Sequence, residues 1–195
     1  MIEEILKLDS KLFLYLNNLG TSKFDNFWIS LSKIEANILM YLFLILLFFY
    51  NQKIRPKLIY IFYFFFVIAL MIIITDQGAN IFKDSFQRLR PCYNESIIDS
   101  LRLVKENCGG KYGFFSAHAS NSFSLAIFFG LLFINRISYI IMITIVYASL
   151  ISYSRIYLGV HYPIDIIFGS FFGIFVGFVM YSFVYLKFLK FFDKT

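Results

Sequence analysis

Long uncharged apolar runs restrict the fold of this chain more than any other feature. Segments 57–80, 117–135, 137–155 and 163–186 each contain an uncharged run of about 18 residues or more, close to the length that a helix needs to cross a bilayer. The chain is 59% hydrophobic and 15% charged, whereas soluble domains average about 25% charged residues. Lipid can cover this apolar surface, but the core of a soluble domain of 195 residues cannot. The sequence therefore predicts an integral membrane protein.

A shorter apolar segment, 34–50, is expected to form a fifth crossing with Lys33 and Glu35 in the lipid headgroups. Apolar residues do not alternate with polar ones as they do in a β-barrel, and a helix satisfies its backbone hydrogen bonds within the membrane. We therefore predict an all-α fold, a polytopic transmembrane helix bundle of five spans. It is expected to form one membrane-embedded domain over residues 1–195.

Residues 1–33 differ from these segments because charged side chains are interspersed among the apolar ones. Apolar residues recur at helical spacing over 2–19, with Glu4, Lys7 and Lys11 between them. This pattern predicts an amphipathic helix that lies in the membrane interface. A sixth span over 2–19 is the alternative, although it would bury several charges.

The distribution of basic residues predicts the orientation. The loop at 51–57, the turn at 136 and the C-terminal tail together carry seven Lys or Arg residues and one acid, whereas the other face carries 11 basic and 10 acidic residues. Lys and Arg concentrate in short cytoplasmic loops. We therefore expect residues 81–116 to form an extracytoplasmic loop. Orientation, rather than nucleic-acid binding, is the expected use of the net charge of +6.

Three glycines, Gly169, Gly173 and Gly177, form a small-residue stripe at four-residue spacing in the last predicted span. Such a stripe allows two helix backbones to approach closely. Packing inside the bundle is the favoured explanation and a dimer seam is the alternative. The sequence leaves the oligomeric state open.

The chain has two histidines, His118 and His161, and the two predicted spans between them bring both to the same outer face. Basic side chains gather at this face. Lys83 and Arg90 are seven residues apart, so they would share one face of a helix, which Pro91 would end.

Two further charged residues belong to this group. Arg155 ends the fourth predicted span, and Asp165 follows His161 by four residues. Charged groups at membrane depth are costly unless they are paired or functional. Guanidinium and ammonium groups match phosphate oxygens. The cluster therefore indicates a phosphate-binding site that contains two histidines.

Three sequence blocks carry a more specific signal. They read KDSFQRLRP at 83–91, FSAH at 115–118 and SRIYLGVHYPID at 154–165. In their order and spacing these blocks resemble the signature of the type-2 phosphatidic acid phosphatase superfamily, which also contains the vanadium haloperoxidases. The resemblance implies a metal-independent membrane lipid phosphatase of the undecaprenyl-pyrophosphatase-like or lipid A phosphatase-like branch.

The same resemblance implies roles for individual residues. His161 would be the nucleophile that forms a phosphohistidine, Asp165 would orient its ring, and His118 would be the general acid. The residues implied in phosphate binding are Lys83, Arg90, Ser116, Ala117 and Arg155. The resemblance to the lipid phosphatase branch implies no cofactor, and it suits the cytoplasmic (inner) membrane of a bacterium. The sequence shows no cluster of carboxylates or cysteines at metal-ligand spacing.

The second block departs from the family pattern at two positions. Phe115 stands where proline is usual, and Ala117 stands where glycine is usual. If residue 117 required a positive φ, alanine would be strained there. Asp76, two helical turns before Lys83, is expected to be a structural partner for a cation of the site rather than a catalytic group.

The substrate is expected to be a phosphorylated membrane lipid. A site at the outer bilayer surface favours a lipid phosphate over a soluble one, and undecaprenyl pyrophosphate is the preferred substrate because its hydrolysis is a common task in the family. A lipid A phosphatase is the alternative with the same chemistry. A transporter, the alternative from another class, predicts polar residues at mid-membrane, where the last three spans are nearly uncharged.

Cys92 and Cys108 are the two cysteines of the chain, and both fall in the predicted extracytoplasmic loop. Disulfides persist in oxidising compartments. We therefore favour a bridge that would anchor the loop beside Arg90, with two free thiols as the alternative.

Overall fold

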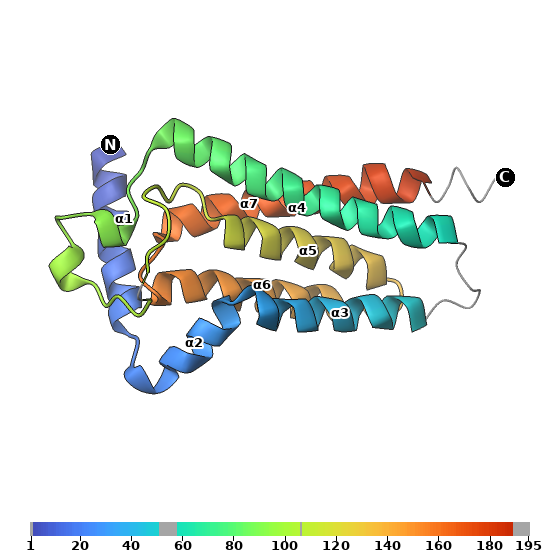
Figure 1. The fold of residues 1–195 in the computed structure, drawn as a ribbon, viewed down its shortest axis with the longest axis horizontal. Helices are drawn as coiled ribbons and strands as arrows, with labels where there is room; N and C mark the ends of the chain where they lie inside the picture. Colours follow the sequence, from blue (N-terminus) through green and yellow to red (C-terminus); the bar gives the residue numbers. More distant parts are fainter. Residues whose placement is uncertain (1, 51–57, 106, 189–195) are drawn as a thin grey trace.

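The structure is a computed structural model that describes residues 2–50, 58–105 and 107–188. In these ranges the chain is helical and contains no β-strand, so the predicted all-α fold is confirmed. Five apolar helices lie lengthwise in one bundle (Figure 1). They are α3 (Ile34–Tyr50), α4 (Leu58–Phe86), α5 (Ala117–Phe133), α6 (Ile140–Tyr157) and α7 (Pro163–Val179), which continues into a π-helical turn (Met180–Tyr185).

Three of the described helical stretches are long and apolar enough to cross a membrane, namely Leu58–Phe86, Ile140–Tyr157 and Pro163–Phe188. A fourth crossing results if the bent pair Ser22–Ser32 and Asn37–Tyr50 is counted as one span. The remaining apolar helix, α5, is shorter, with 17 residues. The five segments predicted from hydropathy therefore correspond to the five bundle helices.

Helix α5 lies at the centre of the bundle, between α4, α6 and α7 (Figure 1). Three glycines of α7 lie directly against backbone carbonyl groups of three serines one turn apart. The pairs are Gly169 with Ser116, Gly173 with Ser120 and Gly177 with Ser124. A Cβ atom at any of these glycines would overlap the facing carbonyl oxygen. The glycine stripe therefore packs inside the bundle, as the favoured explanation predicts.

Helix α1 (Ile2–Asn18) crosses one end of the bundle, and it is not among the candidate spans (Figure 1). Its apolar residues are largely exposed, which suits the predicted interfacial helix. The hydropathy pattern did not reveal that one face of α1 packs against the bundle. On this face Asp9, Phe13 and Asn17 recur every four residues and are buried. Asn17 Nδ2 donates to the carbonyl oxygens of Ile156 and Tyr157, at 3.0 Å each, and thereby caps the end of α6.

The segment after α4 differs from the prediction. The helix ends at Phe86, Gln87 adopts a positive φ of 46°, and Leu89 pairs with Tyr112 in an antiparallel bridge. Arg90 therefore does not share a helix face with Lys83, and Pro91 does not end that helix. The prediction was wrong because it extended the helix to the proline, whereas the chain turns at Gln87 and pairs with a distant segment.

The rest of this end of the molecule is built from short elements. These elements are helix α2 (Asp25–Ser32) and the 3-10 turns Ser22–Phe24, Pro91–Tyr93 and Ile98–Ser100. Arg136 and Lys187 lie toward the opposite end, whereas the other basic residues that predict orientation fall at 51–57 and 189–195, outside the described residues.

Candidate active site

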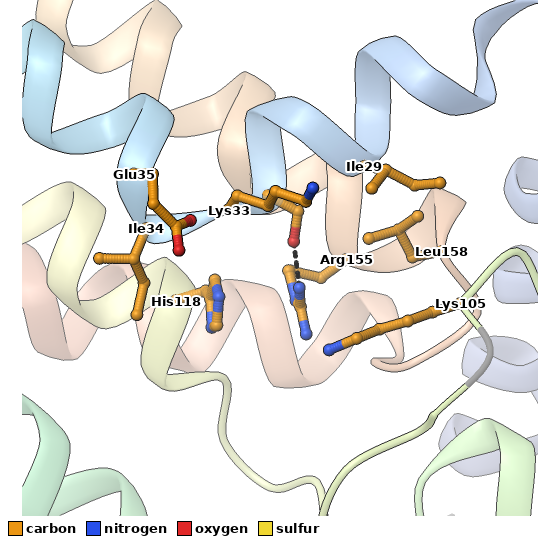
Figure 2. A pocket seen from close by; sticks show the side chains of 9 residues that line it. Ile29, Lys33, Ile34, Glu35, Lys105, His118, Arg155 and Leu158 are labelled. Carbon is orange, nitrogen blue, oxygen red and sulfur yellow. Dashed lines mark hydrogen bonds between the residues drawn. The ribbon is translucent and has the colours of Figure 1, made fainter.

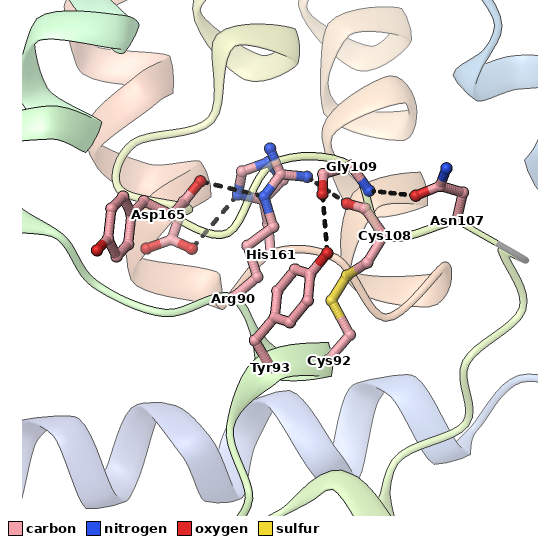
Figure 3. The surroundings of a disulfide bond; sticks show 9 residues. Arg90, Cys92, Tyr93, Asn107, Cys108, Gly109, His161 and Asp165 are labelled. Carbon is pink, nitrogen blue, oxygen red and sulfur yellow. Dashed lines mark hydrogen bonds and ion pairs between the residues drawn. A yellow bond between two sulfur atoms is a disulfide. The ribbon is translucent and has the colours of Figure 1, made fainter.

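His161 lies in the short connection between α6 and α7. Gly159, with φ of 82°, reverses the chain after α6, and Pro163 starts α7. Asp165, in the first turn of α7, accepts a hydrogen bond from the Tyr162 backbone N–H at 3.1 Å through Oδ2. The same oxygen lies 3.4 Å from His161 Nδ1 (Figure 3). The carboxylate therefore interacts with Nδ1, and the other ring nitrogen, Nε2, does not take part in this contact.

Arg88 links this pair to the N-terminal helix. Its guanidinium donates to Asp165 Oδ1 at 2.8 Å and to Asp9 Oδ2 at 2.5 Å, and it lies 4.1 Å from the centre of the Tyr162 ring. Asp9 Oδ1 accepts a hydrogen bond from the Ile164 backbone N–H. Both carboxylates are almost fully buried, so a forked donor between them satisfies two groups that would be costly to leave unpaired.

Gly113 lies close to the His161–Asp165 pair. A Cβ atom at Gly113 would lie 3.1 Å from Arg90 Cγ and 3.2 Å from Asp165 Oδ2. The Gly113 carbonyl oxygen accepts a hydrogen bond from the His161 ring. Gly113 N–H donates to the Arg88 carbonyl oxygen at 2.9 Å, which keeps the two chain segments paired. The glycine therefore leaves room for the His161–Asp165 pair.

Arg90 is held by main-chain carbonyl groups rather than by carboxylates. Its Nη1 donates to Cys108 O at 2.8 Å and its Nε donates to Tyr112 O at 3.1 Å (Figure 3). Cys92 and Cys108 form a disulfide in the structure, with their Cα atoms 6.5 Å apart. The bridge thus lies next to the segment that orients Arg90.

Helix α5 begins at the site and positions His118. Ser116 caps it, since its Oγ accepts a hydrogen bond from Ala119 N–H, and Ala117 is the first helical residue. Gln87 is the non-glycine residue with positive φ among the described residues, so Ala117 is not strained. His118 lines a cavity of about 300 Å³ together with Lys33, Lys105, Arg155 and others. We call this the outer cavity (Figure 2).

Three cations of the site have no carboxylate partner within the described residues. Lys83 donates to the Asn80 side-chain oxygen, Arg90 to backbone oxygens and Arg155 to Ser32 Oγ. Arg155 is only 3% exposed, and its Nε has no hydrogen-bond partner among the residues that the structure describes. Arg88 and Arg102, by contrast, are paired with carboxylates. A buried, uncompensated guanidinium is costly unless an anion joins it.

The electrostatic surroundings keep His161 neutral. Its side chain is almost fully buried, and burial together with the positive charges of Arg90, Arg155 and Lys83 holds its pKa well below the ordinary value of 6.5. A neutral imidazole carries a free electron pair on one ring nitrogen. Because Nδ1 faces Asp165, the free electron pair lies on Nε2 when Nδ1 carries the proton.

The structure brings the predicted residues His118, His161, Asp165, Arg90 and Arg155 to one end of the bundle. Lys83 acts electrostatically on His161 from the end of α4, and Ser116 and Ala117 form the start of α5. Within the described ranges, no group of three or more His, Cys, Asp and Glu side chains is arranged to hold a metal ion.

Sequence reasoning assigned no role to four residues that shape the site: Asp9, Arg88, Lys105 and Gly113. Arg88 lies two residues before Arg90 on an extended segment, and alternate residues of such a segment point the same way. The two-residue spacing of Arg88 and Arg90 was the sequence signal that could have placed Arg88 at the site. Lys105 extends toward Arg155 (Figure 2), and its pKa is lowered by burial and by the charges of Arg155 and Arg90.

Residues 66–189, more than half of the chain, match the PAP2 superfamily. The chain belongs to the PAP2 superfamily. A lipid A 4'-phosphatase of Porphyromonas gingivalis is 34% identical over 186 residues, which are 95% of this chain and 76% of that protein. A lipid A 4'-phosphatase of Bacteroides thetaiotaomicron is 34% identical over 93% of this chain and 79% of its own length.

Two solved structures share the fold. The crystal structure of Aquifex aeolicus LpxE superposes with a TM-score of 0.66 at 24% identity, covering 89% of this chain and 94% of that one. The transmembrane PAP2-type phosphatidylglycerolphosphate phosphatase of Bacillus subtilis superposes with a TM-score of 0.68 at 16% identity, covering 92% and 86%. This PAP2 protein is an integral membrane lipid phosphatase, as the resemblance implied.

Proposed function

We propose that this PAP2 phosphatase removes a phosphate group from a lipid A-type glycolipid through a phosphohistidine at His161. The observation that carries the chemistry is the set of three cations, Lys83, Arg90 and Arg155, that surround the His161–Asp165 pair without carboxylate partners of their own in the described residues. Fixed positive charge around a transferring phosphoryl group is expected to supply the largest stabilisation of the transition state.

The proposed reaction has two steps. His161 Nε2 attacks phosphorus, the bond to the lipid oxygen breaks, and His118 gives its proton to that oxygen. His118 then accepts a proton from water, whose oxygen attacks phosphorus and breaks the P–N bond. Asp165 holds the Nδ1 proton throughout. Lys83, Arg90, Arg155 and the Ser116 hydroxyl bind the phosphoryl oxygens, and the backbone N–H groups at Ala117 face them from the start of α5.

The lipid is proposed from the relatives. The two proteins that match at 34% identity are both named lipid A 4'-phosphatases, and this chain covers three quarters or more of each. Undecaprenyl pyrophosphate, the substrate preferred from the sequence, receives no such support, whereas the lipid A alternative does. We also propose that the site faces the extracytoplasmic side of a bacterial inner membrane, on the Lys and Arg distribution.

The test is phosphate release by the protein purified in detergent from a panel of 4'-phosphorylated lipid A, undecaprenyl pyrophosphate and phosphatidic acid. Lipid A is expected to give the highest kcat/KM, vanadate to inhibit and EDTA not to inhibit. His161→Ala and His118→Ala are expected to lose nearly all activity while the protein still inserts and folds. Full activity of His161→Ala, or strict dependence on added Mg²⁺, would contradict the mechanism.

A further inference from the structure

A second cavity, which we call the inner cavity, extends from His118 into the bundle. It has a volume of about 330 Å³ and lies between α3, α4 and α5. His118 lines both cavities, so the two meet at this side chain. The size is near the lower end of the about 300–1,000 Å³ that is usual for small-molecule sites.

The two cavities differ in charge. The outer cavity is lined by Lys33, Lys105 and Arg155, with one acid, Glu35. The inner cavity is lined by one acid, Asp76, and by no lysine or arginine of the described residues. An anionic phosphoryl group is therefore drawn to the outer cavity and disfavoured in the inner one. The inner cavity suits a neutral group that donates hydrogen bonds.

Asp76 is held in place for such a role. Asn121 Nδ2 donates to Asp76 Oδ1 at 2.8 Å, and the Asn121 side-chain oxygen accepts a hydrogen bond from the Thr75 hydroxyl. Asp76 Oδ2 receives no hydrogen bond from the residues that the structure describes. An acidic side chain inside a membrane span is costly and indicates a functional site when its partner is otherwise missing.

The position of Asp76 relative to His118 indicates which part of the substrate the inner cavity would bind. Asn121 lies one helical turn after His118 on α5, and it contacts Asp76 in the wall of the inner cavity. One turn deeper along each helix, Ile72 and Leu125 make the wall apolar. Apart from the Tyr41 ring of α3, the lining thus changes from polar beside the proposed general acid to apolar within the bundle. This gradient matches a polar ring that carries acyl chains.

We infer that the inner cavity binds the leaving group of the substrate, and that Asp76 and Asn121 recognise the hydroxyl or amide N–H groups of an acylated sugar. The inference rests on the proposed function, because it places the leaving group of the same substrate beside His118. A polyprenyl phosphate has no hydrogen-bond donor on its hydrocarbon side, so it leaves Asp76 unpaired. A site built to bind such donors discriminates strongly against ligands that lack them.

A structural role for Asp76 is the competing explanation. Asp76 acts electrostatically on Lys83, which lies two turns away on α4, but the two side chains form no ion pair within the described ranges. A role through Lys83 would impair binding of every phosphorylated lipid equally and would not affect a ligand that lacks phosphate. The two explanations therefore differ in the ligands that they affect.

The test measures binding of phosphate-free ligands to the full-length protein in detergent. The probes are a dephosphorylated lipid A-type disaccharide and a polyprenol of similar hydrophobicity, measured by thermophoresis. Asp76→Asn keeps the size of the side chain and an oxygen for Asn121. It is expected to weaken disaccharide binding by about ten- to hundred-fold, because the carboxylate oxygen that would accept from the ligand is replaced by an amide NH₂ group, which only donates. Binding of the polyprenol is expected to stay unchanged.

Asp99→Asn, an exposed acid of the loop, is the matched control and should bind both probes like the wild type. Asn121→Ala is the second variant, and it should show the same selective loss if Asp76→Asn reduces thermal stability. Unchanged disaccharide binding by both variants, or an equal loss for both probes, would overturn the inference. Wild-type protein that binds the disaccharide but releases no phosphate from any lipid would instead refute the proposed function.

Discussion

Arg88 and Asp165 form an ion pair 2.8 Å long directly behind the histidine that we propose as the nucleophile. The other oxygen of Asp165 faces His161, and the other arm of Arg88 binds Asp9 on α1. The N-terminal helix is therefore connected to the proposed reaction centre by two consecutive charged contacts. Both arms of Arg88 are thus paired with carboxylates, which makes it a positioning residue in the proposed mechanism.

Arg88→Lys should lower kcat by about tenfold and leave KM nearly unchanged, because a lysine cannot donate to two carboxylates in a fixed fork. Steady-state kinetics on the preferred lipid would measure the two parameters. Arg102→Lys is the matched control, since Arg102 pairs with Asp25 at 2.6 Å at the same end of the bundle without contacting Asp165. Equal losses of kcat in both variants would contradict a specific role for Arg88.

Gly113→Ala should reduce kcat by about tenfold or more, since misplacement of a reacting group by a fraction of an ångström is costly. The added methyl group would lie 3.2 Å from Asp165 Oδ2 and would crowd the His161–Asp165 pair. Gly110→Ala, three residues earlier, is the control because its Cβ atom would meet nothing within 4 Å. The prediction fails if the two variants retain the same activity.

Acidification should destabilise the protein through His161. Its pKa in the folded protein lies below the ordinary value of 6.5, so below pH 6.5 the unfolded chain binds a proton that the folded state does not. Stability is therefore present above pH 6.5 and is lost as the pH falls below it, by at most about 1.4 kcal/mol per pH unit for one group.

Thermal unfolding in detergent between pH 7.5 and 5.5 would measure this effect. The melting temperature of His161→Asn should fall less steeply with pH than that of the wild type, since asparagine does not titrate. Parallel curves for the two proteins would show that His161 is not the group responsible.

The Cys92–Cys108 disulfide should be present in protein taken from its native membrane. Mass spectrometry of non-reduced peptides should find the two cysteines linked. Replacing both by serine should cost about 3 kcal/mol of stability. It should also weaken inhibition by vanadate, because Arg90 donates to the Cys108 carbonyl oxygen. Two thiols that react with an alkylating reagent without prior reduction would refute the bridge.

The proposed orientation predicts labelling from outside the cell. Ser100 is exposed in the short turn Ile98–Ser100, so Ser100→Cys should react with a membrane-impermeant maleimide in intact spheroplasts. The variant should be made in the chain without Cys92 and Cys108, so that one thiol is available. Labelling only after the cytoplasmic face is opened would reverse the orientation.

Local patterns in the sequence were sufficient to locate the helices and to predict the contact between His161 and Asp165. Four uncharged runs of bilayer length and one shorter apolar run located the five bundle helices, because a span must be apolar along most of its length. The four-residue spacing of His161 and Asp165 around Pro163 determined their contact, since the first turn of a helix fixes both positions. The three blocks that resemble the PAP2 signature predicted these residues as the centre of the proposed site.

Tertiary structure alone decided which side chains support that centre. Arg90 lies on an extended segment because Leu89 pairs with Tyr112, and Asp9 reaches Arg88 because α1 folds back across the end of the bundle. Gly113 matters only through its closeness to Asp165. These contacts join residues that are tens of positions apart in the chain, and their energies depend on burial and direction. Periodicity records which face of one helix is apolar, but it carries no information about which distant segment lies against it.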